Sequence, residues 1–258
     1  AETPPLEAKR LLLSRAMTRR GDGRRRKILI VDARKAHLNS KCEEDVYVTL
    51  PEECGCPKGM CAKLNYWLYG FRKAATAWED HYSKLFESVG FRRGGACGGV
   101  FYNKGKDISM AVHGDDFTCL GSDADLDWYE SQLAQNFEIK IRGRLGEGCT
   151  GPQEIRILNR IVSVDSQGLK YEADPRHAEP IVKDLGLEKA KGVTIPGIKE
   201  EGRTCNNHQG LLGASKASEY KAIVARMNYL SADRPDIAFA VKEAAREMSN
   251  PIVGGWDR

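Results

Sequence analysis

Three short apolar runs joined by two turns, between residues 100 and 120, constrain the fold of this chain more than any other feature of its sequence. In order, they are Val100–Tyr102, the turn Lys104–Lys106, Ile108–Val112, the turn Gly114–Asp116, and Phe117–Leu120. Runs rich in β-branched and aromatic residues, separated by short glycine-containing segments, are typical of antiparallel hairpins. The pattern predicts strand, turn, strand, turn, strand, and it places Asp115 and Asp116 at a hairpin tip.

A further apolar run, Ile28–Val31, ends directly on Asp32, 83 residues before Asp115. Such a continuous run is expected of a buried strand. The three carboxylates can converge only if the two strands are neighbours. Two magnesium ions about 3.5–4 Å apart could then activate a hydroxyl and stabilise a departing phosphate oxygen. Spacing leaves an alternative open, because Asp-Asp after glycine is common in turns and an acid at a strand end often caps a helix.

The rest of the chain predicts helices mixed with strands. Apolar residues recur at helical spacing from Ala74 to Val89, and Gly90 is placed as a C-terminal cap. Another helix is expected from Thr3, as the cap, to near Gly21, and Ser122 with its following acids is expected to open a helix roughly over 126–137. Further helices are expected after Asp174-Pro175 and over 220–230 and 235–248, and other strands over 46–50, 137–142 and 154–164. A glycine-rich break over 143–151 and a polar loop over 197–213 complete the expected layout. This order favours an α+β fold with a mixed or antiparallel sheet, followed by a mainly helical part.

The composition is that of a globular intracellular protein. With 258 residues and 41% hydrophobic side chains, the chain can bury a sizeable core. Its apolar stretches are far shorter than the roughly 18 residues of a membrane span. Pro4, Pro5 and Glu7 lie where a secretory signal needs apolar residues. We therefore expect a cytoplasmic or nuclear location and no membrane partner.

Eight cysteines in a chain without a secretion signal are expected to be reduced thiols. Cys54, Cys56 and Cys61 form the cluster to weigh for zinc. Structural zinc sites usually combine paired C-x2-C units, and no second pair completes four ligands here. An ordinary loop is the preferred interpretation, and no zinc is expected.

Nine basic residues lie between Lys9 and Lys27, against Asp22 alone, in a chain whose net charge is +4. Such a run suits a polyanion, because each Lys or Arg near a phosphate releases condensed counterions. A solvated arm or a targeting signal explains the run equally well.

Five segments occur in a fixed order. They read VDARKAHLNS, EEDVYV and PE within 31–52; CAKL, LYGFRKA and AW within 61–78; HGDD at 113–116; FEIK and RLG within 137–146; and Y, ARMNYL and RPDIAFAV within 220–241. The set resembles the reverse transcriptase of Ty1/copia-type retrotransposons. The family's segments read D-V-K-T-A-F-L-N-G with E-E-x-V-Y-M-x-x-P-E, C-K-L-x-K-S-L-Y-G-L-K-Q-A-P-R-A-W, Y-V-D-D, F-x-M-K-D-L-G and Y-R-x-x-V-G-S-L-M-Y-L-x-x-x-R-P-D-I-A-F-A-V. The second is highly specific to the family.

The resemblance implies an RNA-directed DNA polymerase, in which a primer 3′-hydroxyl attacks the α-phosphate of a deoxynucleoside triphosphate. It implies that Asp32, Asp115 and Asp116 are catalytic, and that they bind two ions of Mg2+ or Mn2+. The implied substrate-binding residues are His37, Arg72, Lys73 and His113; for Arg72 and Lys73, solvated surface charge is the alternative. The implied partners are an RNA template, a DNA primer, deoxynucleoside triphosphates and other retroelement proteins.

Four positions depart from the family pattern. His37 stands where the family carries an aromatic residue against the sugar 2′-position, which leaves the choice between deoxy- and ribonucleotides open. His113 and Gly114 replace Tyr and Val beside the acid pair, and Lys73 replaces a Gln.

The resemblance also predicts the domain organisation. Residues 1–148 are expected to form partial fingers plus a palm, and residues 149–258 a thumb or connection region. We expect truncated fingers, no RNase H domain, and weak polymerase activity or none from this chain alone. The alternative is a catalytically inactive retroelement remnant that binds nucleic acid or another protein.

Overall fold

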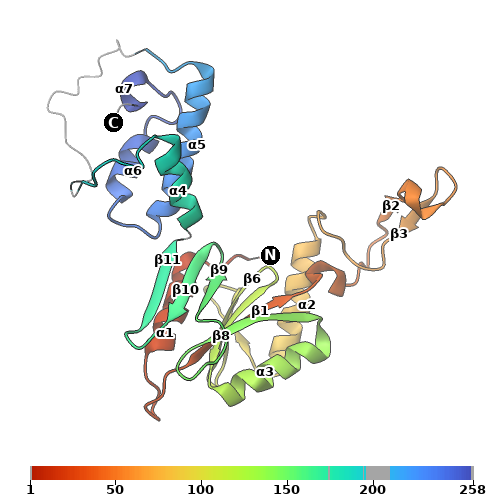
Figure 1. Cartoon of the computed structure of the whole chain (residues 1–258). Coiled ribbons are helices and arrows are strands. Elements are labelled where there is room, and N and C mark those ends of the chain that lie inside the picture. Colours follow the sequence, from red (N-terminus) through yellow and green to blue (C-terminus); the bar gives the residue numbers. More distant parts are fainter. Residues whose placement is uncertain (1, 174, 194, 196–209, 257–258) are drawn as a thin grey trace. The chain divides into compact units, whose positions relative to one another are not determined.

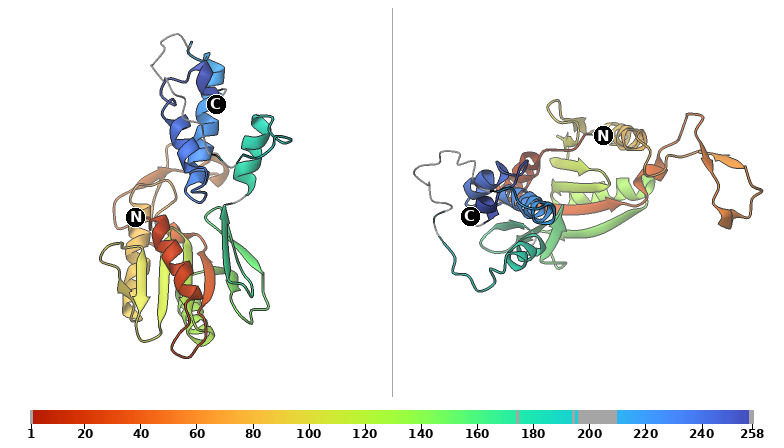
Figure 2. Two further views of the ribbon diagram at one scale, coloured as in Figure 1. Left: turned by 90° about the vertical axis from the view of Figure 1, so that its left-hand side faces the viewer. Right: turned by 90° about the horizontal axis from the view of Figure 1, so that it is seen from above.

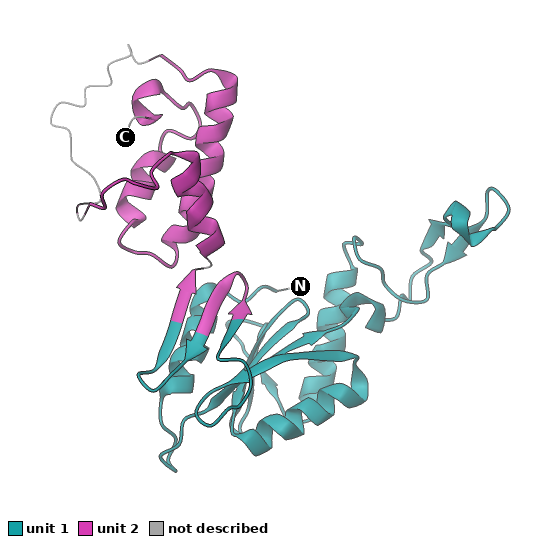
Figure 3. Cartoon of the chain, viewed as in Figure 1, with its two compact units in different colours: residues 1–155, 163–170 teal, residues 156–162, 171–258 magenta. Residues whose placement is uncertain are grey.

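The computed structural model describes residues 2–173, 175–193, 195 and 210–256, and its fold is α+β, as predicted. The chain divides into two compact units (Figure 3). Unit 1 comprises residues 1–155 and 163–170, and unit 2 comprises residues 156–162 and 171–258. Most of the predicted polar loop, over 197–209, falls outside the described residues.

A six-stranded antiparallel sheet forms the centre of unit 1 (Figure 1). In spatial order its strands are β4 (Arg92–Arg93), β5 (Val100–Asn103), β6 (Ile108–His113), β7 (Asp116–Gly121), β1 (Lys27–Ala33) and β8 (Ile139–Leu145). Strands β5, β6 and β7 are the three consecutive strands that the apolar runs predicted. Strand β1 lies between β7 and β8, so the strand that ends near Asp32 is a direct neighbour of the strand that starts at Asp116.

Both faces of β1 are buried. Ile28, Leu29, Ile30 and Val31 are at most 1% exposed, although successive side chains of a strand point to opposite faces. Leu29 and Val31 belong to the core that α2 (Ala74–Ser88) and α3 (Asp123–Asn136) complete. Helix α1 (Leu6–Met17) packs against β1 and β6. Burial on both faces thus holds β1 inside the sheet, between β7 and β8.

Several predicted boundaries agree with the structure and others were wrong. Helix α2 matches the predicted helix, and Ser122 caps α3 by accepting a hydrogen bond from the Asp125 amide. The predicted Thr3 cap was wrong, because α1 begins at Leu6 after Pro5 without a side-chain cap and ends at Met17. The expected break over 143–151 starts later than predicted, after β8 ends at Leu145, and residues 146–151 lie in no helix or strand. Strand β8 continues through Gly143, whose φ of +151° suits glycine.

A two-stranded hairpin projects from unit 1 (Figure 2). It consists of β2 (Tyr47–Thr49) and β3 (Cys61–Lys63), linked through the short helix η2 (Glu52–Cys54). The predicted strand over 46–50 is therefore shorter in the structure. Cys54, Cys56 and Cys61 are exposed on this hairpin, and the seven cysteines within the described residues are free thiols.

The predicted strand over 154–164 is in fact a hairpin, because Leu158 and Asn159 adopt positive φ angles and reverse the chain. Its strands β9 (Glu154–Ile157) and β10 (Arg160–Val164) form a three-stranded sheet with β11 (Leu169–Ala173). The helices that follow are α4 (Pro175–Asp184), α5 (Ala214–Ser231), α6 (Ala238–Ala245) and α7 (Val253–Trp256). None of the helices in the described ranges is long and apolar enough to span a bilayer.

Candidate metal centre

The three predicted carboxylates converge at one end of the large sheet. Asp32 of β1 lies directly opposite Asp116 of β7 in the antiparallel register, so both side chains point to the same face. Asp115 precedes Asp116 in the turn, and its carbonyl oxygen accepts a hydrogen bond of 2.8 Å from the Ala33 amide. Ligand oxygens of the three carboxylates all lie within 4.8 Å of one another. Because β1 and β7 are adjacent, acids that lie 83 residues apart in the sequence form a single cluster.

A two-residue turn presents the acid pair. His113 and Asp116 are the last register partners of β6 and β7, so Gly114 and Asp115 form the loop between them. Gly114 has φ +65°, whereas Asp115 is not among the described residues with positive φ. A first loop residue with positive φ followed by one with negative φ matches a type II′ turn, which favours glycine at the first position.

The surroundings of Asp116 shift the pKa of its carboxyl group. Burial raises the pKa of Asp116, and the neighbouring charges of Asp115 and Asp32 raise it further, whereas Arg142 opposes the shift. The Oδ1 atom of Asp116 is buried and has no hydrogen-bond partner within the described residues. A buried carboxylate oxygen without a donor, beside two further carboxylates, suits a hard divalent cation, which takes oxygen ligands.

Arg142 of β8 approaches two of the three acids. Its Nη2 atom lies 3.2 Å from Asp116 Oδ1 and 3.5 Å from Asp32 Oδ2. Sequence reasoning did not select Arg142. No pattern in the sequence pointed to it, because Arg142 is the residue of β8 that the register shift between Ile30 and Val31 leaves without a partner on β1.

Two predicted substrate-binding histidines lie close to the cluster in sequence. His113 ends β6 opposite Asp116, and burial lowers the pKa of its imidazole. His37 lies in the short helix η1 (Ala36–Asn39), and its ring centroid is 4.4 Å from that of Tyr69. In both histidines Nδ1 is buried and has no hydrogen-bond partner among the described residues. Tyr69 was not selected from the sequence, although the family segment contains it.

The two predicted basic residues before α2 are exposed. The Nζ atom of Lys73 lies 2.6 Å from Glu44 Oε1, so the structure pairs Lys73 with a carboxylate outside the metal cluster. Arg72 lies in the turn that follows Gly70, which has φ +93°.

Part of the N-terminal basic run serves the fold. Arg15, Arg20 and Arg26 each place a guanidinium within 4.0 Å of Asp107, at distances of 2.8, 3.7 and 2.6 Å. Lys27 pairs with Asp123 at 2.6 Å. These four cations therefore have internal carboxylate partners, which favours a structural role over a freely solvated arm.

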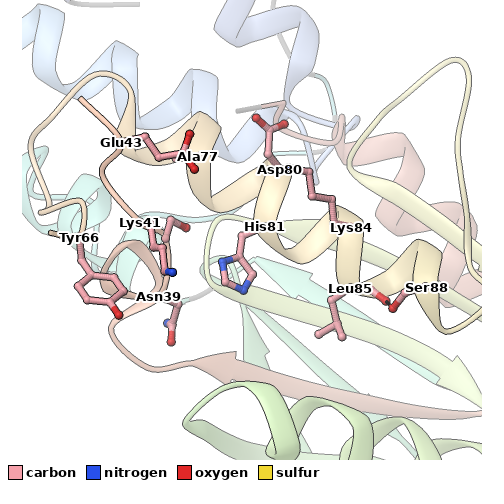
Figure 4. Close-up of a pocket in the computed structure, with 11 residues that line it drawn as sticks. Asn39, Lys41, Glu43, Tyr66, Ala77, Asp80, His81, Lys84, Leu85 and Ser88 are labelled. Atoms are coloured by element: carbon pink, nitrogen blue, oxygen red, sulfur yellow. Dashed lines mark hydrogen bonds between the residues drawn. The ribbon is translucent and has the colours of Figure 1, made fainter.

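A cavity of about 750 Å3 lies beside α2 (Figure 4). His81 and Lys84 of α2 line one side, and Asn39, Lys41 and Tyr66 line another. Its two lysines are matched by two acids, Glu43 and Asp80, so the lining has no net charge that would select an anion or a cation.

Comparisons with known proteins agree with the geometry. Residues 5–199 match the sequence profile described as reverse transcriptase (RNA-dependent DNA polymerase). The chain is 24% identical over 237 residues to the Retrovirus-related Pol polyprotein from transposon TNT 1-94 of Nicotiana tabacum, covering 88% of this chain and 17% of that protein. It is 26% identical over 227 residues to the Pol polyprotein from transposon RE1 of Arabidopsis thaliana, covering 86% of this chain and 14% of that protein.

The chain therefore spans only 14–17% of the length of these two relatives. The profile match covers well over half of the chain, which confirms the predicted family and the palm-like α+β fold. This chain belongs to the reverse transcriptase (RNA-dependent DNA polymerase) family, of the type that Ty1/copia-like retrotransposon Pol polyproteins carry.

Proposed function

We propose that this chain catalyses RNA-directed DNA synthesis by two-metal nucleotidyl transfer at Asp32, Asp115 and Asp116. The single observation that carries the proposal is the convergence of their oxygens within 4.8 Å at adjacent strand ends. Family membership supplies the reaction class, and the cluster supplies hard oxygen ligands suited to Mg2+ or Mn2+.

Each acid has its own part in the proposed site. Asp32 and Asp115 would hold the two ions, and Asp116, whose side chain is somewhat more buried than that of Asp32, would support them. When bound, the ions would activate the primer 3′-hydroxyl and stabilise the charge that develops on the departing pyrophosphate. Arg142 would balance the negative charge of Asp32 and Asp116 before the ions bind, because its guanidinium lies within 3.5 Å of both.

The proposed substrates are a deoxynucleoside triphosphate, an RNA template and a DNA primer. His37 would lie against the sugar, with Tyr69 packed behind it to add ring bulk. His113 would lie near the primer end, and Arg72 and Lys73 would meet template or triphosphate once Lys73 leaves Glu44. Other proteins of the same retroelement are proposed as further partners. Within this chain, residues 1–148 are proposed to contain partial fingers and the palm, and residues 149–258 to form the thumb-like part.

Primer extension tests the proposal. The purified chain, an RNA template with an annealed DNA primer, and deoxynucleoside triphosphates are incubated with Mg2+ or Mn2+. We expect weak, metal-dependent extension that Asp115→Asn abolishes, while Asp45→Asn, which alters an exposed acid paired with Lys63, extends as weakly as the wild type does. Extension that survives in Asp115→Asn would exclude this mechanism.

The inactive-remnant alternative has its own outcome in the same assay. Binding of the primer–template without any extension, under either metal, would favour a nucleic-acid-binding remnant. The binding of metal by the wild type is then measured separately. Metal binding without extension would locate the defect in the substrate-binding part of the site, and loss of metal binding would locate it in the acidic cluster.

A further inference from the structure

The turn that carries the acid pair is held from two sides. The Asp115 carbonyl accepts a hydrogen bond from the Ala33 amide of β1, as described above. On the other side, the indole Nε1 of Trp78 in α2 donates a 3.0 Å hydrogen bond to the carbonyl oxygen of Gly114. These two carbonyls flank the Cα atom of Asp115, so the two hydrogen bonds set the orientation of the peptide on each side of it.

Trp78 is itself held rigidly. Its side chain is 1% exposed, and its ring packs edge to face against Phe137 and Tyr82, with centroid distances of 4.9 and 5.4 Å. A buried indole N–H needs an acceptor, and a ring fixed by such neighbours has little freedom to find another one. The aromatic packing therefore determines where the Gly114 carbonyl is held.

The turn needs this support more than the strands do. Gly114 and Asp115 are exposed, and glycine allows more backbone conformations than any other residue. A metal site requires its ligands within a few tenths of an ångström, and the residues that orient ligands contribute strongly to affinity.

We infer that Trp78 is a positioning residue of the metal centre, which acts by fixing the Gly114–Asp115 peptide through its indole N–H. The inference rests on the proposed function, because it assigns Trp78 a role in the same site. A purely structural Trp78 would contribute through its ring alone, and phenylalanine would then replace it at the cost of stability only.

The first experiment compares Trp78→Phe with the wild type. Phenylalanine keeps an aromatic ring in the core and removes the N–H donor. The matched control is Trp67→Phe, since Trp67 is also buried, at 5% exposure, but lies in a separate hydrophobic cluster. Binding of Mn2+ is measured by electron paramagnetic resonance, and folding is checked by circular dichroism and thermal unfolding.

We expect Trp78→Phe to fold and to raise the dissociation constant for Mn2+ roughly 10-fold or more, in line with other ligand-orienting residues. Trp67→Phe should keep the wild-type value. Unchanged Mn2+ affinity in a folded Trp78→Phe chain overturns the inference and leaves the proposed function intact. Failure of the wild type itself to bind Mn2+ overturns the proposed function, and the inference with it.

A second measurement needs no variant that might fail to fold. The four indole N–H groups, of Trp67, Trp78, Trp128 and Trp256, are followed by hydrogen exchange in a 15N-tryptophan-labelled wild-type chain. Coupling between two sites is reciprocal, so Mg2+ should slow exchange of the Trp78 indole proton if its hydrogen bond supports the site. We expect a several-fold slowing for Trp78 and none for Trp67. Equal exchange at Trp78 with and without bound Mg2+ overturns the inference.

Discussion

Arg142 and Asp116 form an ion pair in which the facing carboxylate oxygen makes no hydrogen bond. The Nη2 and Oδ1 atoms are 3.2 Å apart, yet Oδ1 is buried and has no hydrogen-bond partner in the described parts of the chain. The charge of the cluster is thus partly neutralised while its ligand oxygen stays available. This arrangement suits a site in which a metal ion displaces the Arg142 guanidinium.

Arg142→Gln should bind divalent cations more tightly. The variant removes a positive charge that competes with the metal, and Arg142 is 38% exposed, so the effect is modest. Exposed ion pairs contribute about 0.2–1 kcal/mol, which predicts a dissociation constant for Mn2+ up to about fivefold lower. Isothermal titration calorimetry measures the dissociation constant for Mn2+ in the wild type and the variant. Arg144→Gln is the control, because Arg144 of the same strand pairs with Asp123 and Asp127 of α3. Weaker binding in Arg142→Gln would contradict this role.

Asp107→Asn should destabilise unit 1. Asp107 has ion pairs with three arginines and a φ of +49°, a conformation that asparagine also tolerates, so the substitution removes charge without adding backbone strain. Three partly exposed pairs at about 0.2–1 kcal/mol each predict a loss of about 1–2 kcal/mol in the free energy of unfolding.

Urea denaturation in low and high salt measures the effect of Asp107→Asn, and the difference from the wild type should shrink in high salt. Asp45→Asn, at an exposed acid with a single lysine partner, should keep the wild-type unfolding midpoint. A loss of the same size at all salt concentrations would point to packing in place of charge.

The large sheet could be predicted from the sequence because its signals are local. Short apolar runs predicted β5, β6 and β7 to within one residue at each end, and Ser122 predicted the start of α3. The pairing of β1 with β7 is not local, and no spacing rule specifies which distant strands become neighbours. Only the family resemblance brought Asp32 to the acid pair before the structure did.

The side chains that contact the acidic cluster could not be predicted from the sequence, for a physical reason. Whether Lys140 or Arg142 meets the acids depends on the register of β8 against β1, and that register shifts between Ile30 and Val31. A bulge moves every later pairing by one position, and short sequence patterns do not reveal it. The Trp78 hydrogen bond likewise depends on how α2 lies across the sheet.

The stability of the chain should fall at alkaline pH through Cys119. This thiol is fully buried, and burial raises its pKa to about 12. An unfolded cysteine ionises near pH 8.5, so between about pH 9 and 12 the unfolded chain binds fewer protons than the folded one. The free energy of unfolding then decreases as pH rises, by at most about 1.4 kcal/mol per pH unit for this group.

Urea denaturation between about pH 8 and 10.5 isolates this contribution. Cys119→Ala should be less stable than the wild type at every pH because of the cavity, but its stability should fall less steeply. Cys56→Ala, at an exposed thiol, should keep the wild-type slope. Identical slopes in Cys119→Ala and the wild type would contradict the assignment.

Gly114→Val restores the residue type of the resembling family segment, yet it should weaken this protein. A Cβ atom at Gly114 would meet no described atom within 4 Å, so space is not the obstacle. The obstacle is φ +65°, which is an outlier conformation for a β-branched residue and costs roughly 1–2 kcal/mol or more.

Gly95→Val is the control, since Gly95 also has open space around it and does not have a positive φ. We expect Gly114→Val to lower the unfolding midpoint and to bind Mn2+ more weakly, because the turn must distort beside Asp115, and Gly95→Val to do neither. Wild-type stability and Mn2+ affinity in Gly114→Val would show that the turn adopts the family's conformation, with glycine as a passive replacement.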